Sequence, residues 1–419
     1  MKVVADLHVH SRYAMACSPR ISINEMEATA LQKGINLIST GDFTNPLWLK
    51  EIKSSLEEDD GTGLYKVKSS NTGIRFVMGV EVSNIFNKDG KTRKVHNCIL
   101  LPSIESVEQF NDIAKKYGNL EQDGRPTLMM SNAELVEVVF SITQKAFVFP
   151  AHAWTPYFGV LGSISGFDSM EEAYEEQIKH IHALETGLSS DPKMNWRLSA
   201  LDKYTLISNS DMHSLENMGR EANVFEIERL SYDSVISAIL KKDVSKFKYT
   251  IEFNPEEGKY HYDGHRSCNF SSNPETAKSQ VCPICGKPLT IGVLHRVNEL
   301  ADRPVGFVPE NAIPYTHLVP LMQILSYVYG KTLYSPVIKS TYSKMVSIFG
   351  TEFNVLTDAD IQQIAKFSNE KVAEAIGNVR SGNITIVPGY DGVYGKIDLL
   401  NKEKLENKKI PQKSLFDYK

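Results

Sequence analysis

The stretch that decides the fold is Val3-Val4-Ala5-Asp6-Leu7-His8-Val9-His10, an apolar run with ligand-type side chains at one end. Six further short apolar runs in the first 215 residues also bear a histidine or a carboxylate at one end: residues 37–42, 76–81, 95–101, 147–152, 181–185 and 206–213. A barrel needs strands of this kind to gather a metal site on one rim. The pattern predicts a metalloenzyme.

Helix signals alternate with these runs. Ser22 and Ser131 each open a capping-box pattern, Gly34 is a stop signal, and Gly118 is expected to close a helix that begins near Ser106. Strands that alternate with helices indicate βα units and a mostly parallel sheet. We therefore expect an α/β protein in which seven strands close into a barrel.

The pattern changes twice along the chain. A stretch rich in Gly, Pro, His and Cys follows the barrel, and helical patterning dominates after Pro304. We expect three domains: a metallohydrolase barrel over residues 1–245, a zinc-binding segment over 246–300, and a mainly helical domain over 301–419 that ends in a disordered lysine-rich tail.

Composition points to an ordinary globular protein. The chain has 419 residues, of which 42% are hydrophobic and 23% charged. No apolar stretch approaches the roughly 18 to 20 residues that span a bilayer, and the N-terminus begins directly with a strand. Five cysteines are too sparse for a disulfide framework. We expect an intracellular, cytoplasmic protein without a membrane partner.

Charge is divided unevenly along the chain. Residues 1–240 carry a net charge of −9 and the remainder a net charge of +4, which together give the overall −5. An acidic half that attracts cations, followed by a mildly basic half, fits a metal-dependent enzyme that acts on an anionic substrate.

The candidate ligands lie at alternate positions of predicted strands. Asp6, His8 and His10 share one face, as do Asp211 and His213. Four further candidates follow other runs: Asp42, Glu81, His96 and His152. Imidazole and carboxylate together suit zinc, manganese or iron better than calcium. Any single histidine could instead be a hydrogen-bonded core residue, but the whole set exceeds the needs of one ion. We expect a cluster of two or three ions, with Glu81 as a bridge.

A second group of candidate metal ligands lies between residues 265 and 286. His265 and Cys268 are followed, after thirteen residues, by Cys282-Pro283-Ile284-Cys285-Gly286. Cys-Pro-x-Cys-Gly is a tight knuckle that directs two thiolates at one ion, and the spacing fits a closed tetrahedral zinc site. His261 is the reserve for His265 as the fourth ligand. Zinc binding, on the order of 10 kcal/mol or more, would hold this loop-rich segment folded.

The barrel motifs resemble those of the PHP (polymerase and histidinol phosphatase) metallohydrolase superfamily. The resemblance rests on Asp6-Leu7-His8-Val9-His10, Gly41-Asp42, Gly79-Val80-Glu81, His96, His152 and Ser210-Asp211-Met212-His213. It implies a distorted (β/α)7 PHP barrel, up to three metal ions and phosphoester hydrolysis. One departure concerns the second motif, where Phe43 follows Asp42 in place of the histidine that the superfamily often offers to the third ion.

The resemblance also implies how the ligands are shared. His8, His10, Glu81 and Asp211 would hold one ion, and Glu81 would bridge to a second. That second ion would be bound by His96 and His152, while Asp42 and His213 are the candidates for a third. Two ions can clamp the attacking and leaving oxygens of a phosphodiester, so no nucleophilic side chain is required.

Nearly the whole chain, from the barrel motifs through the zinc segment to the C-terminal part, resembles the endonuclease Q family. The similar segments are residues 260–266, 282–289, 292–297, 300–304 and 388–395. The resemblance implies a DNA endonuclease that nicks 5′ of deaminated bases (uracil, hypoxanthine, xanthine) and at abasic sites. We expect zinc in the structural site and in the catalytic cluster, with manganese or magnesium for activity. The alternatives are a PHP-type phosphoesterase for a small phosphomonoester and a catalytically inert, nucleic-acid-binding repair factor.

Several residues near the predicted rim are candidates for supporting roles. Arg220 is a candidate phosphate contact, and Trp154 and Tyr157 are candidates to stack on DNA, although aromatic side chains in such loops also serve to pack them. Glu185 is a candidate acceptor for the imidazole of a ligand. Residues 412–416 (Gln-Lys-Ser-Leu-Phe) resemble a sliding-clamp motif weakly, the alternative being a disordered end.

Overall fold

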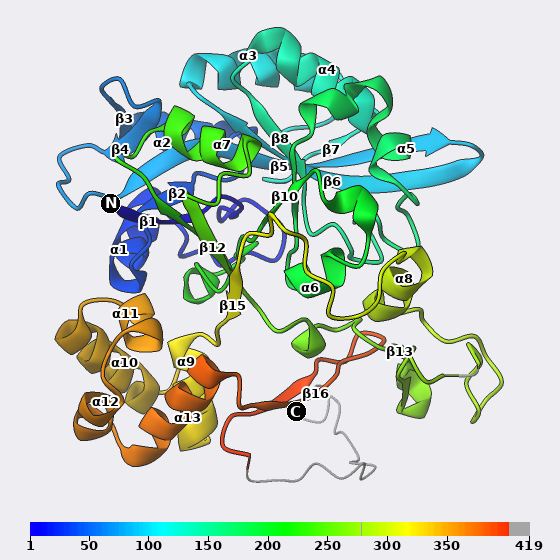
Figure 1. Cartoon of the computed structure of the whole chain (residues 1–419). Coiled ribbons are helices and arrows are strands. Elements are labelled where there is room, and N and C mark those ends of the chain that lie inside the picture. Colours follow the sequence, from blue (N-terminus) through cyan, green and yellow to red (C-terminus); the bar gives the residue numbers. More distant parts are fainter. Residues whose placement is uncertain (278, 402–419) are drawn as a thin grey trace.

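The centre of the molecule is a mixed sheet with helices packed around it. The computed structural model describes residues 1–277 and 279–401. Eleven strands form the main sheet: β1 (Lys2–Asp6), β2 (Leu37–Ser39), β3 (Leu56–Asp59), β4 (Leu64–Val67), β5 (Arg75–Lys88), β6 (Lys91–Leu101), β7 (Thr127–Leu128), β8 (Phe147–Pro150), β11 (Ala222–Glu226), β12 (Phe247–Glu252) and β15 (Tyr315–His317). Two further strands, β9 (Ala183–Glu185) and β10 (Thr205–Ile207), pair with each other. The α/β class is therefore confirmed (Figure 1).

The sheet is more antiparallel than expected. β1, β2 and β5 run parallel, but β5 and β6 form one long antiparallel hairpin, and β6 also pairs antiparallel with β8. The hairpin turns at Asp89-Gly90, where both residues have positive φ (52° and 73°). Such a conformation suits a two-residue turn, for which Asp-Gly is a preferred pair. The expectation of a mostly parallel sheet was therefore wrong at this hairpin.

The strands share one interior core. Each of the seven strands that contain or precede a candidate site residue sends an apolar side chain into it: Ala5, Leu37, Val77, Leu100, Phe149, Ala183 and Ile207. Neighbouring positions on the same strands pack outward beneath the helices, as the two-residue period of a strand requires. Strand pairing is absent between β8 and β9 and between β10 and β1 in the part of the chain that the structure describes. The predicted closed barrel is therefore not confirmed.

Seven helices accompany the strands: α1 (Ile23–Lys33), α2 (Pro46–Ser55), α3 (Ile104–Ala114), α4 (Asn132–Ile142), α5 (Met170–Tyr174), α6 (Pro192–Asn195) and α7 (Tyr232–Leu240). The predicted caps of α1 are present, with Ser22 at its start and Gly34 in the left-handed conformation at its end. Ser131 forms the expected capping box on α4. α3 ends at Ala114, so Gly118 does not close it.

Two smaller parts lie below the main sheet in Figure 1. The cysteine-bearing segment contains β13 (Asp263–His265), β14 (Phe270–Ser272) and α8 (Val293–Leu300). The C-terminal part contains α9 (Leu321–Tyr329), α10 (Pro336–Phe349), α11 (Glu352–Thr357), α12 (Ile361–Phe367), α13 (Glu370–Ser381) and the hairpin of β16 (Thr385–Val387) and β17 (Lys396–Asp398). The main sheet extends past the expected boundary at residue 245, since β12 and β15 belong to it.

A buried ion pair joins the C-terminal helices to the part of the chain that carries the main sheet. Lys33 Nζ of α1 donates to Glu352 Oε2 of α11 at 2.9 Å, and the same carboxylate accepts from Tyr342 and from the backbone of Leu321. Because both members of the pair are buried, this contact depends on close packing between the two parts. Within the described residues, no helix is both long and apolar enough to cross a lipid bilayer.

Candidate metal centre

The loops that follow β1 and β10 lie side by side and present the first ligands. The backbone N–H of His10 donates to Met212, and that of Asp211 donates to His8. Asp6 holds the same corner in place, because its carboxylate accepts from the backbone N–H groups of Ser210 and Gly219. His8, His10 and Asp211 are thereby brought together from distant positions in the chain.

Three residues of the centre have left-handed backbone conformations. The φ angles of Asp42, His152 and Asp211 are 48°, 30° and 45°. Non-glycine residues rarely adopt positive φ, and those that do cluster at functional sites, where surrounding contacts hold the strained backbone. In this centre, the strained residues follow the ends of three different strands.

The first ligand group comprises His8, His10, Glu81 and Asp211, whose ligand atoms all lie within 4.8 Å of one another. His10 Nε2 is 3.1 Å from Glu81 Oε2 and 3.0 Å from Asp211 Oδ1. His8 Nε2, His10 Nε2 and Asp211 Oδ1 are buried and have no hydrogen-bond partner. Buried polar atoms are nearly always satisfied, so three unsatisfied ligand atoms that converge on one point fit a divalent ion.

The second ligand group comprises Glu81, His96 and His152. Glu81 Oε1 lies 2.7 Å from His96 Nδ1 and 3.0 Å from His152 Nε2, whereas Oε2 faces His8 and His10. One oxygen of the carboxylate therefore serves each group. This is the arrangement that a bridging ligand requires. Glu81 and His96 lie in the middle of the β5–β6 hairpin, and neither stands at a strand end.

Residues behind the ligands set the orientation of the rings. Glu185 is fully buried, and both of its oxygens lie 3.1 Å from His8 Nδ1. It also accepts from the backbone of His152 at 2.8 Å and from Asn209 at 2.8 Å. Carboxylates in this position set the tautomer of a ligating histidine and raise its basicity. Glu185 therefore supports both ligand groups.

Asp42 has the same role for His10. Its Oδ1 lies 3.0 Å from His10 Nδ1, and its Oδ2 accepts from the backbone of Ser11 at 2.6 Å. His213 is half-exposed, with Nδ1 2.9 Å from the carbonyl of Asp211. In the part of the chain that the structure describes, neither Asp42 nor His213 belongs to a group of three ligand atoms. The expected third ion, for which Asp42 and His213 are the candidates, therefore stays a prediction, and the Asp42 carboxylate already faces His10.

The ionisable side chains of the centre shift one another's pKa values. Burial lowers the pKa of His96 to about 4, although the negative charge of Glu81 acts in the opposite direction. Burial alone would raise the pKa of Glu81, but His96, Arg125 and His8 outweigh it and hold the pKa well below its usual range. Burial lowers the pKa of His10, yet Asp42 and Asp211 raise it well above its ordinary value. An ion in the first group would therefore compete with a proton.

Arg125, which no sequence motif marks, also belongs to this centre. It lies in the loop before β7, and its Nη1 donates to Glu81 Oε2 at 3.1 Å. No histidine or carboxylate motif surrounds it in the chain. Only the tertiary fold brings it to the ligands.

The three predicted substrate contacts differ in their placement. Trp154 is fully buried, and its indole donates to Asn195 at 2.7 Å, so it packs the loop and is not available to stack on DNA. Tyr157 is 48% exposed. Arg220 donates to the carbonyl of Ser210 at 2.9 Å and lines an open hollow of about 250 Å³. Its place next to Asp211 keeps it a candidate contact.

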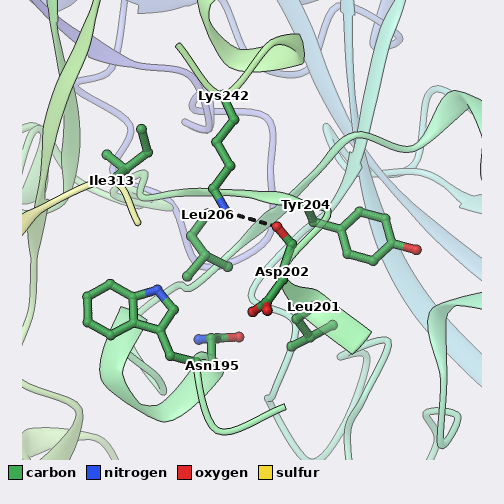
Figure 2. A pocket seen from close by; sticks show the side chains of 8 residues that line it. Asn195, Leu201, Asp202, Tyr204, Leu206, Lys242 and Ile313 are labelled. Atoms are coloured by element: carbon green, nitrogen blue, oxygen red, sulfur yellow. Dashed lines mark hydrogen bonds between the residues drawn. The ribbon is translucent and has the colours of Figure 1, made fainter. Parts of the chain in front are cut away.

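A separate enclosed cavity lies at the opposite end of β10. Figure 2 shows its lining, in which Lys242 donates to the carbonyl of Asp202. Its volume of about 10 Å³ leaves room for at most one water molecule. It therefore has no role in binding a substrate.

The four predicted zinc ligands meet in one place. His265, Cys268, Cys282 and Cys285 lie with their ligand atoms within 4.8 Å of one another. Gly286 has a φ of 72°, and its N–H donates to the carbonyl of Cys282, as a tight knuckle requires. Burial disfavours the thiolate of Cys282, but the backbone N–H groups that face it lower its pKa to about 6. This closed set of three sulfurs and one nitrogen suits a structural ion.

One family model and two known proteins match parts or nearly all of the sequence. A family model described as the MJ0043 C-terminal domain matches residues 320–383. The uncharacterized protein YqxK of Bacillus subtilis is 27% identical over 416 residues, which cover 94% of this chain and 99% of that protein. The uncharacterized protein MJ0043 of Methanocaldococcus jannaschii is 33% identical over 252 residues, or 59% of this chain and 31% of that protein.

Two solved structures match almost the whole chain. The first is the lesion-specific endonuclease PfuEndoQ from Pyrococcus furiosus, with a TM-score of 0.84 and 32% identity over 96% of this chain and 98% of that one. The second is endonuclease Q in complex with a 27-mer duplex substrate that has an abasic lesion at the active site. Its TM-score is also 0.84, with 32% identity over 97% of this chain and 99% of that one.

Proposed function

The chain belongs to the endonuclease Q family, and we propose that it is a DNA repair endonuclease that hydrolyses the phosphodiester 5′ of deaminated bases (uracil, hypoxanthine, xanthine) and of abasic sites. The observation that carries the proposal is the pair of ligand groups that share Glu81. The unsatisfied buried atoms of His8, His10 and Asp211 converge there. Such a shared carboxylate can hold two ions close enough together to act on one phosphodiester.

The ligand sets suggest which ion each site takes. Imidazole with carboxylate suits zinc or manganese, and we assign zinc to the closed Cys₃His site and to the cluster, with manganese or magnesium as the activating ion. When bound, divalent ions supply positive charge at the phosphate and acidify water. The seven strands that carry these ligands would correspond to a distorted (β/α)7 barrel.

The protein's own residues orient the ligand rings and leave one side of the centre open to the substrate. Glu185 and Asp42 hold the imidazoles of His8 and His10 so that both Nε2 atoms face inward. The side chain of Asp211 is 23% exposed, whereas those of the first group's other ligands are almost completely buried. The centre therefore opens to solvent beside Asp211, and the scissile phosphate would enter there.

Selectivity for deaminated bases requires contact with the base itself. A damaged nucleotide is less costly to turn out of the duplex than an intact one, and uracil and hypoxanthine share a carbonyl where cytosine and adenine carry an amino group. Arg220, which donates to the carbonyl of Asp211, and the exposed Tyr157 are the substrate contacts that we retain. The zinc segment and the C-terminal helices would hold the duplex, a need that a phosphomonoesterase does not have.

The experiment that tests the proposal compares three substrates. The purified protein, loaded with manganese or magnesium, would be incubated with a duplex that contains one uracil, with a matched undamaged duplex, and with a chromogenic phosphomonoester. We expect nicking of the uracil duplex alone, and its loss in Asp211→Ala. Turnover of the phosphomonoester without nicking would replace the proposal by a small-molecule phosphoesterase. A mobility shift without cleavage would replace it by a binding factor.

A further inference from the structure

Arg125 stands in the metal centre without being a ligand. It occupies the loop between α3 and β7, and its Nη1 lies 3.1 Å from Glu81 Oε2, the oxygen that also faces His8 and His10. Its positive charge also acts on Asp211 and on His96, so its field extends over both ligand groups. Beside bound metal ions, this cation would add to the positive charge of the centre and so favour the entry of an anion.

The loop holds Arg125 firmly. The N–H of Gly124 donates to Tyr13 at 3.0 Å, and its carbonyl accepts from Thr44 at 3.3 Å. The backbone N–H of Arg125 itself donates to Asp123 at 3.1 Å. Gly124 also approaches Asp42 so closely that a Cβ would lie 2.4 Å from Oδ2. The guanidinium is thus placed in advance by the packing of its own backbone.

Most of the hydrogen-bonding capacity of Arg125 remains available. A guanidinium has five N–H donors in a rigid fork. In residues 1–277 and 279–401, its acceptor is Glu81 alone. The side chain is 22% exposed, similar to the 23% of Asp211 and the 31% of His213. These three side chains are the more exposed members of an otherwise buried centre, and the remaining donors of Arg125 have no acceptor among the described residues.

We propose that Arg125 is a catalytic residue that contacts a non-bridging oxygen of the scissile phosphate. The inference rests on the proposed function and adds a protein cation to the two ligand groups. Negative charge spreads over the equatorial oxygens as a phosphoryl group is transferred. A guanidinium held beside Glu81 stabilises this charge without moving, and its fork matches phosphate oxygens better than an ammonium does.

The test compares Arg125→Ala and Arg125→Lys with wild type in single-turnover nicking of a uracil duplex. We expect Arg125→Ala to slow nicking by roughly 10² to 10³, as for the loss of one charge-stabilising donor, and Arg125→Lys to be intermediate. The metal content, measured by mass spectrometry after gel filtration, should equal that of wild type. Added guanidinium ion should restore part of the activity of Arg125→Ala and leave Asp211→Ala inactive.

Arg229→Ala is the matched control, because Arg229 is exposed and its side chain donates to the carbonyl of Asp60, with no hydrogen bond or ion pair to a candidate ligand among the described residues. Loss of bound metal from both Arg125 variants in proportion to activity would overturn the proposal and make Arg125 a support of Glu81. Unchanged nicking, or full metal content without rescue by guanidinium, would overturn it as well. If wild type itself fails to nick the uracil duplex, the proposed function fails instead, which distinguishes the two outcomes. A thermal unfolding curve for each variant shows whether Arg125→Ala folds. If it does not, Arg125→Lys alone tests the proposal.

Discussion

Replacing Glu185 by glutamine should weaken metal binding in both ligand groups, but unequally. The carboxylate faces His8 Nδ1 with both oxygens at 3.1 Å, whereas it supports His152 through that residue's backbone N–H. Glutamine keeps the size of the side chain and one acceptor oxygen but removes the negative charge. The charge matters most to the imidazole of His8, because it raises the basicity of that ring as a ligand.

The size of the effect differs between the two ions because Glu185 supports their ligands in different ways. Loss of a supporting carboxylate typically costs 10- to 100-fold in metal affinity, which corresponds to about 1.4 to 2.8 kcal/mol. We expect this loss for the ion held by His8, and less than about tenfold for the ion held by His96 and His152, since a backbone N–H can still donate to the glutamine oxygen.

The assay is a competition titration of metal-stripped protein against a chromogenic chelator, which resolves two affinities. Glu226→Gln is the matched control, because Glu226 is 65% exposed by its side chain and lies away from the ligands. A larger loss of affinity for the second ion than for the first would contradict this expectation, because it would place the effect of Glu185 on His152. Unchanged affinities for both ions would remove Glu185 from the centre altogether.

Three further predictions concern other parts of the molecule. Burial raises the pKa of Glu252 to about 7. The folded state therefore holds this proton more tightly than the unfolded state, so its contribution is complete below about pH 4.5 and is lost as the pH rises through 7. Glu252→Gln should thus reduce the fall in unfolding free energy between pH 5 and pH 8 by roughly 3 kcal/mol, measured by urea denaturation; an unchanged pH dependence would contradict this. Cys282→Ser should release the structural ion and expose residues 261–290 to proteolysis, while the ions of the catalytic cluster stay bound. Loss of all bound metal would contradict the prediction that the two sites bind their ions independently. Gly124→Ala should reduce nicking because the added Cβ would displace the Asp42 carboxylate. Gly377→Ala is the control, since its Cβ would meet only Ile361 at 3.9 Å, and it should leave nicking unchanged. Equal activities of the two variants would contradict this prediction, because they would show that the loop can shift to accept the Cβ.

The candidate ligands that the structure brings together could be selected from the sequence because they belong to short motifs. His8 and His10 follow an apolar strand at alternate positions, and Asp211 stands in a similar motif, so local pattern alone selects them. The cysteine knuckle is equally local, and its glycine has the left-handed conformation that the motif requires. The resemblance to the endonuclease Q family, based on such segments, is confirmed by the full-length structural matches.

The wrong predictions have both local and tertiary causes. Asp89-Gly90 is a local hairpin signal, and at this point of the chain it outweighs the alternation of strands and helices. Trp154 has a side chain suited to stacking on DNA, but the fold buries it against Asn195, which is distant in sequence. Asp42 has a carboxylate suited to binding a metal ion, but the fold places it against the ring of His10. Arg125 could not be selected, because nothing in its neighbourhood distinguishes it from a surface arginine. The domain boundaries remain a prediction, although β15 returns to the main sheet from beyond the zinc segment. The proposed clamp motif lies outside the described residues.

The proposed function depends above all on a cluster built around Glu81 that cleaves damaged DNA next to the lesion. The decisive experiment maps the nick at single-nucleotide resolution on an end-labelled duplex with one hypoxanthine, with an undamaged duplex alongside. We predict one cut, immediately 5′ of the lesion, that is absent from the undamaged duplex and abolished in Glu81→Gln. Equal cutting of both duplexes, or a cut that persists in Glu81→Gln, would contradict the proposed function.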